Sequence, residues 1–108
     1  MMTAVQLQVT TDDEATAHRL AHELVAARLA ACAQVLGPMT SHYRWNDRLQ
    51  VAREWLLLVK TEEDRVAAAV DAVVSRHPAE VPEIVALAVV GGHDAYLGWV
   101  HDATRPPA

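Results

Sequence analysis

Residues Ser41–Thr61, with the sequence SHYRWNDRLQVAREWLLLVKT, predict one long β-hairpin. Side chains alternate in polarity from His42 to Trp45 and again after the turn pair Asn46-Asp47, whereas Trp55–Val59 is continuously apolar. Alternation is typical of a strand with one face in water, and a continuous apolar run is typical of a strand covered on both faces. The second arm is therefore expected to change from a half-exposed to a buried strand along its length.

The predicted hairpin is longer than the domain that should carry it. About 12 residues from Leu49 to Lys60, at ~3.3 Å each, span roughly 40 Å. A compact chain of 108 residues is about 34 Å across, judged from its expected radius of gyration. The hairpin should extend beyond its own domain, and its open strand edges then need a partner. The hairpin alone thus predicts an oligomer.

Length and composition limit the protein class. The chain has 108 residues, of which 52% are hydrophobic, and this predicts one domain over residues 1–108 with apolar surface to bury between subunits. A net charge of −5 with nine scattered basic residues argues against a nucleic-acid surface and against a basic membrane patch. No apolar stretch approaches the ~20 residues needed to cross a bilayer. The start lacks a signal-peptide pattern and Cys32 is the single cysteine, so we expect a cytoplasmic protein.

The rest of the chain supplies strands and helices in a recognisable order. The expected elements are a strand at Val5–Val9, a helix capped by Thr11 and running to about Ala31, a strand from Cys32 that bends at Gly37-Pro38, the hairpin, a helix capped by Thr61 and stopped by His77-Pro78, a strand at Ile84–Val90, a short helix from Asp94, and a loose tail at Thr104–Ala108. The order β-α-β-β-α-β predicts an α+β ferredoxin-like sandwich. Both helices should cover one face of the sheet and leave the other face to neighbouring subunits.

Blocks of residues along nearly the whole chain resemble the CutA family of divalent-cation tolerance proteins. The blocks are Arg28–Cys32, Ser41 with Tyr43 and Trp45, Glu54–Thr61, His77-Pro78 with Glu80–Ile84, and Tyr96-Leu97 with Trp99. The resemblance implies a homotrimer in which the hairpin arms pair between subunits, as in PII-type signalling proteins. It also implies a role in tolerance of copper and other divalent metals, with copper binding.

The chain departs from the family pattern at a few positions. Asp47 stands where the family usually has glycine, and Ala79 stands where it usually has tyrosine. Val9 and Arg76 replace a cysteine and a histidine that some members carry, so these two copper ligands are missing here.

Candidate metal ligands each have a structural alternative. Cys32 offers the soft thiolate that copper(I) prefers, but it also suits a buried position at the start of a strand. His77 offers an imidazole, but it also suits the cap of a helix C-terminus. Glu80 and Glu83 flank a rigid Val81-Pro82 pair and could bind a hard cation or form salt bridges with arginine.

A second histidine pattern lies on the first helix. Glu14, His18 and His22 follow one another at a spacing of four residues, which puts them on one helical stripe. Histidines at this spacing can share a divalent ion. The stripe lies opposite the apolar face, so a solvated surface is the favoured interpretation.

The aromatic residues predict an interface. Packing is their first role, but a trimer could also bring them together as an inter-subunit cleft for a small ligand, lined by Tyr43, Trp45, Glu54, Lys60 and Trp99. No glycine-rich phosphate loop, nucleophile elbow or CxxC motif favours an enzyme, and no organic cofactor is expected.

These observations lead to three hypotheses. The first is a non-enzymatic cytoplasmic homotrimer that binds copper or another divalent metal. The alternative is a PII-like signalling module that binds a small molecule or a protein partner. The third, with the least support, is an enzyme that uses Lys60, Glu54 or His77 as acid–base groups.

Overall fold

The structure is a computed structural model of the chain and describes residues 3–107. Met1, Met2 and Ala108, which belong to the expected start and tail, lie outside the described residues. The elements are β1 (Ala4–Thr11), α1 (Glu14–Ala26), β2 (Cys32–Trp45), β3 (Arg48–Glu62), a 3-10 turn (Glu63–Arg65), α2 (Val66–Arg76), β4 (Ile84–Ala88) and α3 (Asp94–Ala103).

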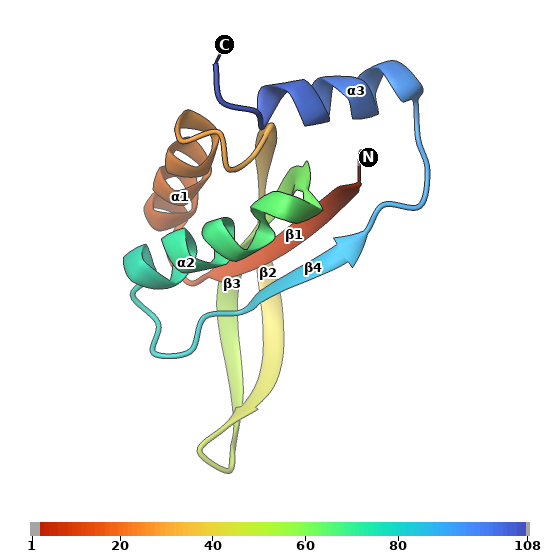
Figure 1. Cartoon of the computed structure of the whole chain (residues 1–108). Helices are drawn as coiled ribbons and strands as arrows, with labels where there is room; N and C mark the ends of the chain where they lie inside the picture. Colours follow the sequence, from red (N-terminus) through yellow and green to blue (C-terminus); the bar gives the residue numbers. More distant parts are fainter. Residues whose placement is uncertain (1–2, 108) are drawn as a thin grey trace.

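The four strands form one antiparallel sheet in the order β2-β3-β1-β4. The strand β1 is central, and Val5 lies opposite Thr61 of β3 on one side and Ala88 of β4 on the other. Helices α1 and α2 cover one face of the sheet, and α3 lies across the end where β1 begins (Figure 1). This arrangement confirms the predicted α+β ferredoxin-like sandwich.

The hydrophobic core lies between the sheet and the two helices. Because side chains alternate along a strand, Leu7 and Val9 of β1 point to the same face as Leu57 and Val59 of β3. These four side chains have no exposed surface. They pack against the apolar stripes of α1 and α2, namely Ala17, Leu20, Ala21, Leu24, Ala69 and Val73.

Neither α1 nor α2 covers the opposite face of the sheet, and α3 reaches it only at one end, where Tyr96 contacts Cys32. Leu36, Val85 and Leu87 belong to strands of the sheet, and their side chains are 60%, 47% and 44% exposed. These residues lie on the two outer strands, and Gln6 and Gln8 of β1 lie between them on the same face. Exposed apolar residues grouped on one face often mark an interaction surface.

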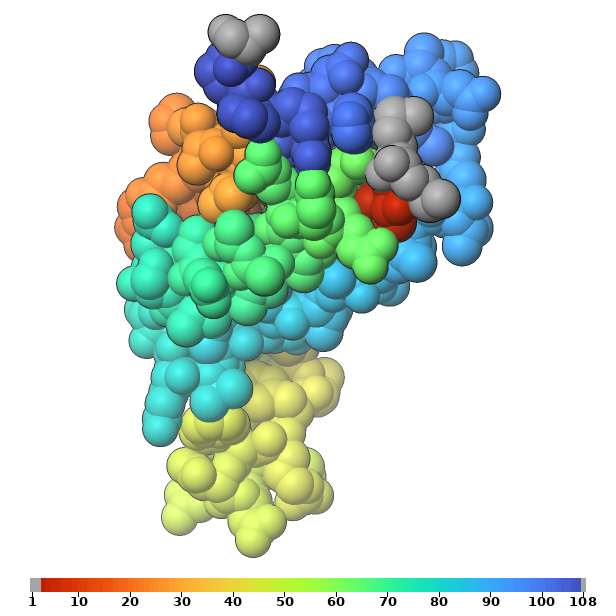
Figure 2. Space-filling view, viewed as in Figure 1, coloured from red at the N-terminus to blue at the C-terminus, as the bar shows by residue number. Residues whose placement is uncertain are grey.

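The long hairpin is confirmed. The strands β2 and β3 have 14 and 15 residues, and the hairpin projects well beyond the helices in the ribbon and space-filling views (Figures 1 and 2). The molecule measures 47 × 25 × 21 Å. At the tip, Asn46 and Asp47 both have positive φ, 51° and 63°, which is the backbone of a type I′ turn.

The bend expected at Gly37-Pro38 is also present. The register of β2 against β3 shifts between Leu36 and Met39, so the glycine and the proline form a bulge on the outer strand. Gly37 has a φ of 153°, and its backbone lies directly against Trp55. The bulge therefore separates the part of β2 that borders the domain from the part that projects.

The helix starts differ from those predicted. The cap of α1 is Asp13 rather than Thr11, because Asp13 Oδ2 accepts from the Thr16 backbone N–H at 2.9 Å. The helix α2 begins at Val66 rather than after Thr61, because Thr61 is buried in β3 and its hydroxyl donates to the Leu29 carbonyl at 2.7 Å.

Three further boundaries also differ from those predicted. The helix α1 ends at Ala26 rather than near Ala31, since Arg28 adopts a positive φ of 58° and the Leu29 N–H bonds back to the Leu24 carbonyl. The strand β4 ends at Ala88 rather than Val90. The cap of α3 is His93, whose Nδ1 accepts from the Tyr96 N–H, and Asp94 occupies the first turn.

The expectation of a loose tail is wrong for its first residues. Thr104 is fully buried, and Arg105 binds both carboxylate oxygens of Asp64 at 2.6 and 2.7 Å. Within residues 3–107, no helix combines the length and the apolar character that crossing a membrane requires.

Candidate functional site

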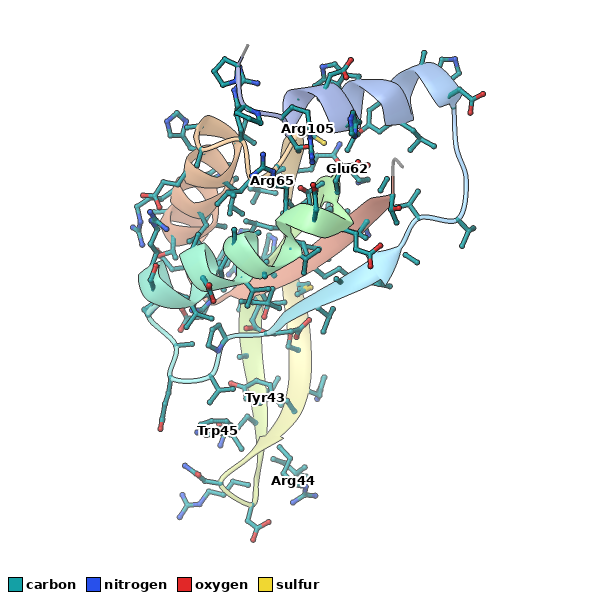
Figure 3. The ribbon with its side chains drawn as sticks, in the orientation of Figure 1. Tyr43, Arg44, Trp45, Glu62, Arg65 and Arg105 are labelled. Atoms are coloured by element: carbon teal, nitrogen blue, oxygen red, sulfur yellow. The ribbon has the colours of Figure 1, made fainter. Side chains whose placement is uncertain are left out.

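A groove of about 620 Å³ lies between the projecting hairpin and the segment that leads into β4. Tyr43 and Trp45 project from the hairpin on the side of this segment, whereas Arg44 points to the other side (Figure 3). In the space-filling view the segment around residue 80 lies against the base of the hairpin (Figure 2). We call this cavity the hairpin groove; it is lined by Thr10, Thr11, Asp12, Ser41, His42, Tyr43, Trp45, Ala52, Glu54 and residues 77–83.

The wall of the hairpin groove at residues 77–83 is hydrogen-bonded to β1. His77 Nε2 donates to the Thr10 carbonyl at 2.6 Å, and His77 Nδ1 accepts from the Ala79 N–H at 3.0 Å. The Thr10 N–H in turn donates to the Glu83 carbonyl at 3.4 Å. Since Nδ1 accepts a backbone hydrogen bond, the proton of the neutral ring must be on Nε2. Both ring nitrogens are therefore engaged, and a metal could bind His77 only by breaking one of these bonds.

The hairpin groove is negatively charged. Four carboxylates line it, from Asp12, Glu54, Glu80 and Glu83, and no described lining residue is a lysine or arginine. Within residues 3–107 these carboxylates form no salt bridge. The described residues of a single chain thus provide no arginine partner for Glu80 or Glu83.

The other predicted residues lie at the far end of the sheet. Cys32 lies opposite Lys60 in the β2–β3 register, and its Sγ is 3.3 Å from Tyr96 Oη. The Tyr96 and Trp99 rings are 5.6 Å apart on α3. Lys60 is four residues along β3 from Leu56, the residue opposite Thr10, which is roughly 13 Å of strand. Within one chain, Cys32, Lys60 and Trp99 are thus separate from the hairpin groove.

The contact between Cys32 and Tyr96 changes the chemistry of the phenol. The hydrogen bond with Cys32, and to a lesser extent burial, raise the pKa of Tyr96 from 10.0 to about 12. The phenol therefore keeps its proton to a higher pH than an ordinary tyrosine.

The donor sets of a single chain do not fit a closed metal site. Within residues 3–107, no group of three or more His, Cys, Asp or Glu side chains is placed to hold a metal ion. His18 Nε2 lies 3.9 Å from Glu14 Oε2, and both side chains are more than 60% exposed. This pair is a solvated surface contact, as the helical pattern favoured.

A second polar cluster, which joins α3 to the start of α2, has little signal in the sequence. His101 Nδ1 lies 2.7 Å from the buried Glu62 Oε1, and Arg65 Nε donates to the Thr104 carbonyl at 2.8 Å. Figure 3 shows Glu62, Arg65 and Arg105 gathered between these two helices.

Three groove residues, Thr10, Asp12 and His42, are not among the predicted site residues. The only sequence feature that points to any of them is the position of Asp12 directly after the first strand.

The chain has clear relatives. Residues 5–103 match the CutA1 divalent ion tolerance protein family. The chain is 38% identical over 102 residues to the divalent-cation tolerance protein CutA of Salmonella newport (strain SL254), covering 94% of this chain and 89% of that protein. It is 40% identical over 97 residues to Protein CutA of Mus musculus, covering 90% of this chain and 55% of the mouse protein, so it spans about half the length of that relative.

The solved structures agree with the sequence relatives. The divalent cation tolerance protein Cut A1 from Thermus thermophilus superposes with a TM-score of 0.92 at 37% identity, covering 94% of this chain and 99% of that one. The chain therefore belongs to the CutA1 divalent ion tolerance protein family.

Proposed function

We propose that the chain is a non-enzymatic cytoplasmic protein of the divalent-cation tolerance type that works as a homotrimer and binds copper or another divalent metal. The observation that carries this proposal is the group of exposed apolar residues on the sheet face away from α1 and α2, beside a hairpin that projects from the domain. Membership of the CutA1 family supports the link to divalent cations. The cytoplasmic location rests on the single cysteine and is tested by cell fractionation.

Self-association would cover the exposed sheet face. Leu36, Val85 and Leu87 remain exposed in one chain, and β2 and β4 are the outer strands of the sheet. Outer strands offer unpaired backbone groups that a second chain can bind. A neighbouring copy that brings its hairpin to such an edge would satisfy these groups and bury the apolar face.

The oligomer is tested by light scattering coupled to size exclusion. We expect a particle of three chains, each of 11.8 kDa. Val85→Arg, on the sheet face away from α1 and α2, should dissociate it, whereas Val74→Arg should not, because Val74 is similarly exposed but lies on the outer side of α2. A folded 11.8 kDa monomer of the unaltered protein at micromolar concentration would refute this part of the proposal.

Metal binding would require donors from more than one chain. The Cys32 thiol is the soft donor for copper(I), and Glu80 and Glu83 are exposed carboxylates without salt bridges. Calorimetry with copper and zinc should give fewer than one ion per chain, and Cys32→Ala should weaken copper more than zinc. If neither metal binds saturably at micromolar concentration, the metal part of the proposal fails.

A second candidate function is a PII-like module that binds a small molecule or a protein partner. The hairpin groove favours it, since its volume of about 620 Å³ lies in the range of small-molecule sites. Copper and organic probes distinguish the two candidates: binding of organic probes to the groove without saturable metal binding would favour the module.

A further inference from the structure

We infer that the hairpin groove binds an organic ammonium ion, that is, a small cation with an apolar body. The inference rests on the second candidate function above, in which the groove is a ligand site. It adds the chemical class of the ligand, which follows from the charge, the aromatic surface and the rigidity of the groove.

The charge of the groove favours a cation over a neutral or anionic ligand. Asp12, Glu54, Glu80 and Glu83 line it, and none of these four carboxylates has a salt bridge within residues 3–107. No described lysine or arginine lines the groove, so these carboxylates have no permanently charged basic neighbour among the lining residues. A cation in the groove would therefore be attracted by several carboxylates and would meet no lysine or arginine among the described lining residues.

The aromatic residues favour an organic cation over a metal ion. Tyr43 and Trp45 line the same cavity and are 45% and 41% exposed. The face of a tryptophan or tyrosine ring attracts ammonium groups and also packs against their carbon atoms. A bare divalent ion requires several converging donors instead, and no group of three such donors exists within residues 3–107.

The groove is also preformed. His77 and Glu83 both bond to the backbone of Thr10, so the wall between them is attached to β1 at each end. Pro78 and Pro82 stiffen this wall further, because proline fixes its own φ. A preformed site spends little binding energy on ordering, so even a small cation can bind measurably.

The test compares matched probes of different charge. Putrescine and tetraethylammonium are the cations, 1,4-butanediol is the neutral analogue of putrescine, and succinate is the anionic one. Calorimetry gives the dissociation constants, and the NMR signal of the Trp45 indole N–H reports on the groove while that of Trp99 serves as an internal reference. We expect the cations to bind at least about tenfold more tightly than the diol and to bind more weakly as salt is added.

Variants assign the binding to the groove. Glu80→Gln with Glu83→Gln should weaken putrescine roughly tenfold, and Trp45→Leu should weaken tetraethylammonium by roughly fivefold. Asp71→Asn removes one negative charge from the exposed surface of α2, outside the groove, and should leave both affinities unchanged. Circular dichroism confirms that each variant is folded.

The failures can be told apart. If the diol or succinate binds as tightly as the cations and shifts Trp45, the groove is a ligand site but the proposed class is wrong. If no probe of any charge shifts Trp45, the groove is no ligand site, and the second candidate function fails with the inference. The inference would also be overturned if the Trp45 signal responded only to protein concentration, or responded to copper more strongly than to either cation.

Discussion

The thiol of Cys32 at the start of β2 lies 3.3 Å from the phenol oxygen of Tyr96 on α3. The two residues are 64 positions apart in sequence, so this contact ties the last helix to the edge of the sheet. The same contact gives Cys32 a structural role beside its proposed role as a copper ligand.

Removing this contact should change the titration of Tyr96. The hydrogen bond with Cys32 raises the pKa of Tyr96 from 10.0 to about 12, so its contribution to stability is complete below pH 10 and is lost as the pH rises through about 12. Cys32→Ala should move the pKa back toward 10.0, measured by NMR of the Tyr96 ring. Cys32→Ser, which keeps a hydrogen-bonding group, should retain part of the shift. An unchanged Tyr96 pKa in Cys32→Ala would contradict the assignment.

Gly37 should not tolerate a side chain. An added Cβ would lie 2.8 Å from Trp55 Cδ1 and 3.1 Å from the Glu54 carbonyl oxygen. Gly37→Ala should therefore lower the free energy of unfolding by about 1–3 kcal/mol, measured by urea denaturation. Gly98→Ala is the control: a Cβ there meets nothing within 4 Å, and it should stabilise α3 by about 0.5–1 kcal/mol. Equal effects of the two substitutions would refute the steric argument.

The turn of the hairpin is strained at Asp47. Its φ of 63° is one that glycine adopts without cost. Asp47→Gly should therefore raise the free energy of unfolding by up to about 1 kcal/mol. Asp71→Gly, in the middle of the exposed side of α2, should instead lower it by a few tenths of a kcal/mol. A loss of stability in Asp47→Gly would show that the aspartate contributes something beyond the turn.

The ion pair between Arg105 and Asp64 should make the stability of the protein depend on pH in the acid range. The hydrogen bonds from Arg105 hold the pKa of Asp64 below its ordinary value of 3.8. A carboxylate with a lowered pKa contributes stability above pH 3.8. This contribution is lost as the pH falls through the lower pKa that Asp64 has in the folded protein. Arg105→Gln should therefore be less stable than the unaltered chain at neutral pH, and the difference should disappear in strong acid.

A matched variant controls for the loss of one positive charge. Arg48, at the tip of the hairpin, has no salt bridge within residues 3–107. Arg48→Gln should leave the dependence of stability on pH unchanged. Thermal unfolding of the three proteins across acid pH would decide the matter: a pH-independent difference for Arg105→Gln would contradict the ion-pair explanation.

The fold could be predicted because its main signals are local. Alternation in the hairpin and the helical stripes depend on near neighbours, and so does the positive-φ turn at Asn46-Asp47. The helix starts could not be predicted as reliably. Thr11 and Asp13 are both good caps, and only the length of β1 decides between them. Thr61 has the sequence of a cap, but its hydroxyl is used by the Leu29 carbonyl.

Within one chain, the residues predicted to line an inter-subunit cleft lie in two separate groups. Tyr43, Trp45 and Glu54 do share a cavity with His77 and Glu80, whereas Lys60 and Trp99 lie at the other end of the sheet. Which residues are neighbours depends on the register of β1 against β3 and on the bulge at Gly37. Both involve pairing between distant parts of the chain, which periodicity does not reveal.

The central place of β1 bears on how the protein is made in the cell. The ribosome synthesises β1 first of the four strands, but its two neighbours in the sheet, β3 and β4, end only at Glu62 and Ala88. Until these residues have emerged, the apolar side chains of β1 have no sheet to join, and both of its edges stay open to other chains. The nascent chain is therefore expected to need a chaperone, or β3 and β4 must pair with β1 quickly once they have emerged, although the finished domain is small.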